Sequence, residues 1–81
     1  MARRTRRALT SADAIEKILG ELRASLEVRP QRLASPEEGY AFVRIKLEEL
    51  FEAVRELQGT DLRTSALQLA AVAVRFAVEC T

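Results

Sequence analysis

The segment from Ala66 to Val78 most restricts how this chain can fold. It reads ALQLAAVAVRFAV, in which only Gln68 and Arg75 are polar. A helix that is apolar nearly all the way round must be buried on several sides, because exposed apolar surface is unfavourable in water. A chain of 81 residues has little material with which to surround such a helix. The segment therefore predicts a helix that a second copy of the chain helps to cover.

The length of the chain allows one small domain, which no internal disulfide and no histidine metal site reinforces. Chains of this size bury only about 60–65% of the surface that the unfolded chain exposes. Cys80 is the single cysteine and there is no histidine, so self-association is the remaining way to add buried surface. No apolar run reaches the roughly 18–20 residues of a membrane span, and the basic start lacks the apolar core of a signal peptide. We therefore expect a cytoplasmic protein with no membrane contact.

The charge is unevenly distributed along the chain. Arg3, Arg4, Arg6 and Arg7 lie in the first seven residues, whereas residues 8–81 carry 9 basic and 12 acidic groups. This divides the chain into a basic arm, residues 1–9, and a single helical domain, residues 10–81. The arm is either a loose, solvated tail or a contact for nucleic acid or an acidic protein.

Helix signals predict a first helix over residues 11–28. The Thr10 hydroxyl can cap its start, and Asp13 follows three residues later in a variant of the capping box. Leucine and isoleucine then recur at spacings of four, three and four, which predicts one apolar stripe. Pro30 ends the helix, because the residue before a proline avoids the α conformation.

The second helix is predicted over residues 36–58. Ser35 is its expected N-cap, Pro36 suits the first helical position, and Glu38 completes a capping box. Gly59 is expected to end the helix. Apolar residues along it repeat at spacings of four and three, as in a bundle or coiled-coil seam.

The third helix is predicted over residues 61–79, with Thr60 or Asp61 as its cap. The short turn before it makes it antiparallel to the second helix. The fold class is therefore all-α, with three helices and a long hairpin that forms a four-helix core when two chains pair. The predicted dimer core comprises Leu47, Leu50, Val54, Leu67, Ala70, Ala71, Val74 and Phe76.

The second helix also carries several glutamates that could hold a metal ion. Glu49 and Glu52 are three residues apart on one face, and Glu56 lies a further turn on. Two carboxylates at this spacing can hold Mg²⁺, which in turn binds phosphates. The facing helix has no acidic residue between residues 63 and 78. The alternative to a metal site is therefore that these glutamates form a solvated face of the second helix, partly neutralised by Arg44 and Arg55.

Residues 35–78 carry a family resemblance, in the stretches SPEEGYAFVRIKLEELFEAVREL and SALQLAAVAVRF. The matching positions are Glu38, Gly39, Tyr40 and Ala41, then Leu47, Glu49, Leu50, Phe51, Glu52 and Val54, then Ala66, Gln68, Ala70, Ala71, Ala73, Arg75 and Phe76. The pattern resembles the small MazG-like helical proteins of bacteria and phages, which belong to the all-α nucleoside triphosphate pyrophosphohydrolase superfamily. The resemblance implies an all-α fold and a dimer.

The resemblance also implies that most metal ligands are replaced. The paired glutamates of the family fall on Ile45 and Lys46, so that only Glu49 remains from the first metal motif. The second motif falls on Ser65 and Gln68. Lys46 would place a positive charge where the ion should lie, which argues against Mg²⁺-dependent release of pyrophosphate.

These observations support three functional hypotheses. The first is a non-catalytic helical oligomerisation or adaptor protein without a cofactor. The second is a divergent nucleotide pyrophosphohydrolase that uses Mg²⁺ at Glu49 and Glu52, with further ligands from a partner chain. The third is a nucleic-acid-associated protein whose paired arginine arms bind the phosphate backbone.

Overall fold

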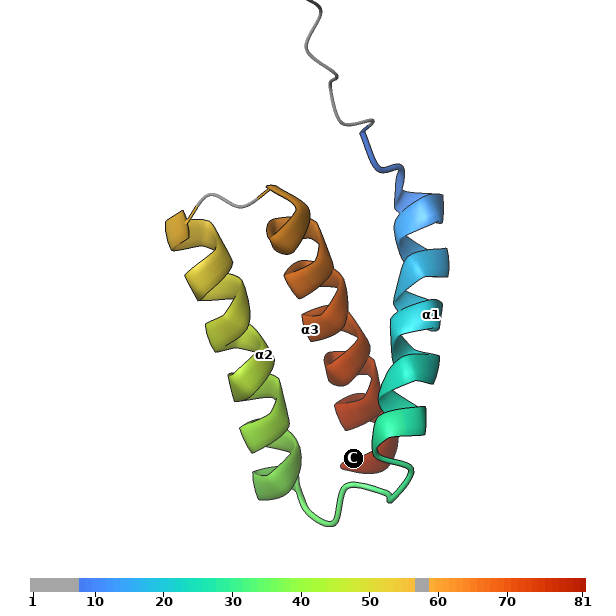
Figure 1. Cartoon of the computed structure of the whole chain (residues 1–81). Coiled ribbons are helices and arrows are strands. Elements are labelled where there is room, and N and C mark those ends of the chain that lie inside the picture. Colours follow the sequence, from blue (N-terminus) through green and yellow to red (C-terminus); the bar gives the residue numbers. More distant parts are fainter. Residues whose placement is uncertain (1–7, 57–58) are drawn as a thin grey trace, which may run out of the picture.

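The computed structural model describes residues 8–56 and 59–81, and of residues 59–61 only the backbone. This part of the chain forms three helices and no strand: α1 (Ser11–Val28), α2 (Pro36–Glu56) and α3 (Gly59–Glu79) (Figure 1). The all-α prediction is therefore confirmed. The bounds predicted for the first helix are those of α1, whereas the expected end of the second helix at residues 57–58 lies outside the described residues.

The start of α3 differs from the prediction. The helix begins at Gly59 rather than at residue 61, so Gly59 opens α3 instead of ending α2. Thr60 and Asp61 consequently lie within the first turn and are not N-cap residues. Glycine is tolerated there because the first N–H groups of a helix have no partner within the helix and do not depend on its regular hydrogen bonds.

The boundaries of α1 follow from its local chemistry. The Asp13 N–H donates to Thr10 Oγ1 over 3.1 Å, which confirms the predicted N-cap. At the other end the Arg29 N–H donates to the Ser25 carbonyl over 2.9 Å, and Pro30 prevents a further turn.

The cap of α2 is only partly the predicted capping box. The Glu38 N–H donates to Ser35 Oγ over 3.1 Å, as expected for an N-cap serine. The Glu38 carboxylate does not return to Ser35, however, but accepts the Ala34 N–H over 2.5 Å. Its second oxygen is held by the Arg29 guanidinium at 3.0 Å. This ion pair draws the carboxylate toward the preceding loop and accounts for the shift by one residue.

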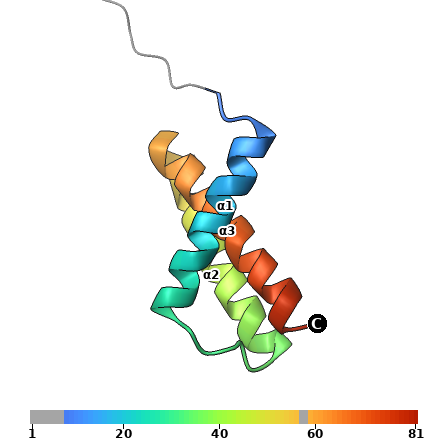
Figure 2. The same ribbon diagram turned by 90° about the vertical axis from the view of Figure 1, so that its right-hand side faces the viewer.

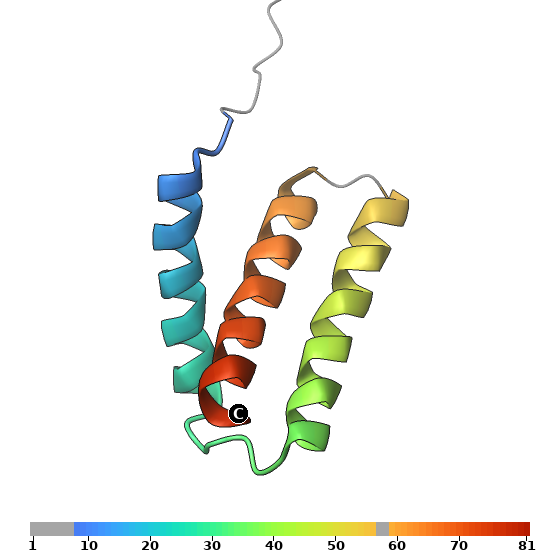
Figure 3. The ribbon, with the colours of Figure 1, turned by 180° about the vertical axis from the view of Figure 1, so that it is seen from behind.

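The helices form a single layer with α3 in the middle. The α1 and α2 helices pack on opposite sides of α3, and within the described residues they make no helix–helix contact with each other (Figures 1 and 3). The α2 helix runs antiparallel to α3, whereas α1 crosses it obliquely (Figure 2). The molecule is correspondingly elongated and thin, with principal extents of 52 × 26 × 19 Å.

A layer of this kind encloses little. The buried apolar residues of the described part are Leu33, Ala53, Ala71 and Val72, and no large side chain in that part is fully buried. One face of α3, including Ala71, Val72 and Arg75, is covered by its neighbours. Val74, on another side of the helix, remains 40% exposed. A single chain thus covers α3 only in part.

The helices approach closely where α2 begins and α3 ends. Gly39 is buried there, and a Cβ atom at this position would lie 2.6 Å from Cys80 Sγ and 2.6 Å from Phe76 Cδ2. The absence of a side chain at Gly39 is therefore what allows the ends of the hairpin to close.

Candidate functional site

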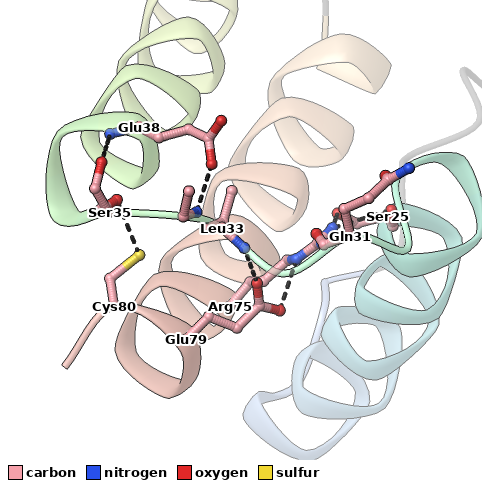
Figure 4. Close-up of polar contacts among 9 residues, drawn as sticks. Ser25, Gln31, Leu33, Ser35, Glu38, Arg75, Glu79 and Cys80 are labelled. Atoms are coloured by element: carbon pink, nitrogen blue, oxygen red, sulfur yellow. Dashed lines mark hydrogen bonds and ion pairs between the residues drawn. The ribbon is translucent and has the colours of Figure 1, made fainter.

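A buried polar cluster fixes the loop between α1 and α2 to the end of α3 (Figure 4). Its centre is Arg75, which is only 4% exposed. The Arg75 guanidinium donates to Glu79 Oε2 over 2.8 Å, to the Ser25 carbonyl over 3.2 Å and to the Gln31 carbonyl over 2.6 Å. The arginine thus joins α3 to the C-terminal end of α1 and to the loop that follows it.

Glu79 completes the cluster from the next turn of α3. Its Oε1 accepts the N–H of Leu33, a buried loop residue, over 2.7 Å. Burial alone would raise the pKa of Glu79, but the hydrogen bonds from Leu33 and Arg75 and the positive charge of Arg75 outweigh it and lower this pKa below its ordinary value. The carboxylate is consequently held in its charged form. Arg75 and Glu79 are four residues apart, a spacing that already indicates an ion pair on one helix.

One side of the layer, which we call the open face, exposes large apolar side chains from all three helices. It is the side on which Tyr40 and Val43 of α2 line a cavity with Ala73 and Phe76 of α3. The exposed fractions of its large apolar residues lie between 39% and 60%. These residues are Ile15, Leu19 and Leu26 of α1, Tyr40, Leu47, Phe51 and Val54 of α2, and Val74 of α3.

The opposite side, which we call the groove face, is more polar. Glu21 and Val28 of α1, Lys46 of α2 and Gln68 of α3 line one cavity there, of about 150 Å³. Consecutive helical residues are about 100° apart, so Leu19 and Leu26 lie roughly 160° around α1 from Glu21 and Val28. The apolar stripe of α1 therefore belongs to the open face.

Three ion pairs run along α2, each between residues of that helix. Glu48 pairs with Arg44 at 3.3 Å, Glu49 with Lys46 at 3.3 Å and Glu52 with Arg55 at 3.4 Å. The Lys46–Glu49 pair borders the groove face. The MazG-like resemblance would place Lys46 and Gln68 in opposing halves of a metal site. Both residues do line the same cavity.

The structure brings no set of metal ligands together around Glu49 and Glu52. Within residues 8–56 and 59–81, no group of three or more acidic, cysteine or histidine side chains is placed to hold an ion. The metal hypothesis for Glu49 and Glu52 stays a prediction that depends on ligands from another chain. The arginines of the arm, at positions 3, 4, 6 and 7, lie outside the described residues.

The residues predicted to form a dimer core differ in their surroundings. Leu47, Val54 and Val74 are 40–48% exposed, whereas Ala71 is 1% exposed and is already buried within one chain. The others are half-buried: Leu50, Leu67, Ala70 and Phe76. Periodicity identified the apolar positions, but it did not identify α3 as the middle of a layer, and the contribution of α1 to the open face was therefore missed.

Comparison with known proteins adds no relative. No protein-family model, curated protein or solved structure matches this chain. The MazG-like resemblance therefore stays a hypothesis that rests on the matched residues alone. In the described part of the chain, no helix has the length and apolar character needed to cross a membrane.

Proposed function

We propose that this protein is a non-catalytic helical self-association module in which two copies cover each other's open face. The observation that carries the proposal is the exposure of large apolar side chains from all three helices on one side of the layer. Monomeric soluble proteins rarely expose contiguous apolar patches of more than a few hundred Å². A surface of this kind is typical of a protein interface.

The free energy available from covering this face is substantial. Full burial of a large apolar side chain contributes about 1.5–3 kcal/mol, and the eight residues of the open face are on average about half exposed. Covering them would contribute on the order of 6–12 kcal/mol per chain. The cost of association is of comparable size, about 4–15 kcal/mol for the pair. Two such faces together therefore supply enough to hold a dimer.

A second copy is the occupant that the chain itself favours. In the described part of the chain the buried apolar residues are Leu33, Ala53, Ala71 and Val72, and the chain has neither a disulfide nor a histidine metal site to compensate for so small a core. Val43, Leu47 and Val54 belong to a repeat of four and three residues, which allows α2 to pack along an identical helix. Pairing α2 and α3 of each copy would give the four-helix core expected from the sequence.

The test compares two substitutions on opposite flanks of α2. Leu47 and Ile45 are 48% and 50% exposed, but they lie about 160° apart around the helix. Leu47→Glu places a charge on the open face, whereas Ile45→Glu makes a matched change on the other flank. The mass in solution is measured by light scattering during size-exclusion chromatography, over a range of protein concentrations.

We expect a dimer for the unmodified protein and for Ile45→Glu, and a monomer for Leu47→Glu. A charge placed inside an apolar interface lacks a partner and its water shell, so it opposes association. A monomer at every concentration for the unmodified chain would refute the proposal. A dimer that survives Leu47→Glu but not Ile45→Glu would show that the wrong face has been assigned.

A further inference from the structure

The groove face holds a second cavity, which differs from the cavities described above in the charge of its lining residues. It has a volume of about 170 Å³ and lies between the C-terminal end of α1, the first half of α2 and the second half of α3. Its apolar lining comes from Val28, Leu33, Phe42 and Val72. Its charged lining residues are all basic: Arg29, Lys46 and Arg75.

These three cations differ in how many of their donors are already used. Arg75 is engaged by Glu79 and by two carbonyl groups of the cluster described above. Arg29 lies over the Phe42 ring, with its guanidinium carbon 4.6 Å from the ring centroid, and pairs with Glu38. Its Nε is nevertheless buried and has no hydrogen-bond partner among the described residues. Buried donors are rarely left unpaired, because an unpaired donor loses its hydrogen bonds to water without replacement.

Lys46 is the cation whose spare donors a ligand can reach. An ammonium group can donate three hydrogen bonds, and its ion pair with Glu49, at 3.3 Å, accounts for one of them. The Lys46 side chain is 30% exposed, and the contact of its ammonium with Glu49 is open to solvent. The acidic groups near the site, Glu38, Glu49 and Glu79, are each bound to one of these cations and do not line the cavity.

We propose that this cavity binds a small carboxylate with an apolar body, such as an aromatic or short-chain acid. The apolar body would lie against Phe42 and Val72, and the carboxylate would accept hydrogen bonds from the Lys46 ammonium, with the positive charge of Arg29 nearby. A cavity of about 150 Å³ is large enough for one benzene ring, so the size fits a single aromatic ring. The site lies on the face opposite the proposed dimer interface and does not depend on that proposal.

The experiment titrates the full-length protein with benzoate and with benzyl alcohol, an uncharged ligand of nearly the same size. Binding is followed by NMR through the methyl signals of Val28 and Val72. Hydrogen bonds to charged groups are about twice as strong as neutral ones, so we expect benzoate to bind about ten-fold more tightly than the alcohol. In Lys46→Gln the two ligands should bind within about two-fold of each other.

Lys17→Gln is the matched control, because Lys17 is the other lysine of the chain and does not line this cavity. It should retain the preference for benzoate. Thermal unfolding of both variants verifies that each is folded before titration. Equal binding of benzoate and benzyl alcohol to the unmodified protein, or no shift of either valine, would overturn the proposal. A preference for benzoate that persists in Lys46→Gln would show that the carboxylate is recognised elsewhere.

Discussion

Alanine at Gly39 should destabilise the fold, whereas alanine at Gly20 should stabilise it. Both glycines lie inside helices, where replacement by alanine ordinarily contributes about 0.5–1 kcal/mol of stability. The two positions differ in their surroundings. A Cβ atom at Gly20 meets no atom within 4 Å, whereas one at Gly39 would lie 2.6 Å from both Cys80 Sγ and Phe76 Cδ2.

The size of the effect follows from this difference. Both substitutions gain the stability that alanine adds inside a helix. The difference in stability between the two variants therefore measures the cost of overpacking at Gly39, which is about 1–3 kcal/mol. A change of 1 kcal/mol shifts the melting temperature of a domain of this size by about 4–8 °C. Gly39→Ala should therefore melt at least about 4 °C below Gly20→Ala, and Gly20→Ala should melt above the unmodified protein.

Thermal unfolding followed by far-UV circular dichroism provides the assay. All proteins are compared at one concentration, because self-association makes the melting temperature depend on concentration. Adding Cys80→Ala to Gly39→Ala removes one of the two close side chains and should restore part of the loss. Equal melting temperatures for Gly39→Ala and Gly20→Ala would mean that the two helix ends do not approach as closely as described.

Two further predictions concern the Arg75 cluster. Arg75→Met should lower the free energy of unfolding by about 3 kcal/mol in urea titrations, because removing one partner of a buried ion pair leaves the other charge uncompensated; a loss below about 1 kcal/mol would contradict this role. The second prediction concerns acid. The folded-state pKa of Glu79 is below the ordinary value of 4.5, so its contribution to stability is complete above 4.5 and is lost as the pH falls through the folded pKa. Glu79→Gln should remove this part of the acid dependence, and an unchanged pH profile of stability would refute the assignment.

Local signals in the sequence predicted most of the helix boundaries, because caps act over three or four residues. Thr10 and Pro30 delimit α1 as expected, and Ser35 caps α2. The signal at Gly59 was ambiguous, since glycine is compatible with the end of one helix and with the first turn of the next. The hydrogen bond from the Ala34 N–H to the Glu38 carboxylate was not predictable either, because it depends on the position of Arg29 in space.

The candidate sites were harder to predict, because they depend on which helix lies in the middle. The apolar sequence of α3 predicted a helix covered on several sides; α1 and α2 cover two of them, and Val74 remains 40% exposed. The sequence marks Arg75 only as one of two polar residues in an apolar segment, whereas in the structure it is buried and donates to Ser25, fifty residues earlier. Contacts over such separations leave no periodic trace in the sequence. The basic cavity likewise combines residues from three helices and the intervening loop.

The central position of α3 also bears on how the chain assembles. The α2–α3 pairing joins neighbours in the sequence. Among the described helices α1 contacts α3 alone, and all of α2 lies between these two helices in the sequence. Closing a long loop costs more entropy than closing a short one, so contacts between sequence neighbours form more readily. We therefore expect the α2–α3 hairpin to form first and α1 to dock on it once α3 is in place. On this order the hydrogen bond from Arg75 to Ser25 is made in the last step, and we expect α1 to separate more easily from the fold than the two helices of the hairpin.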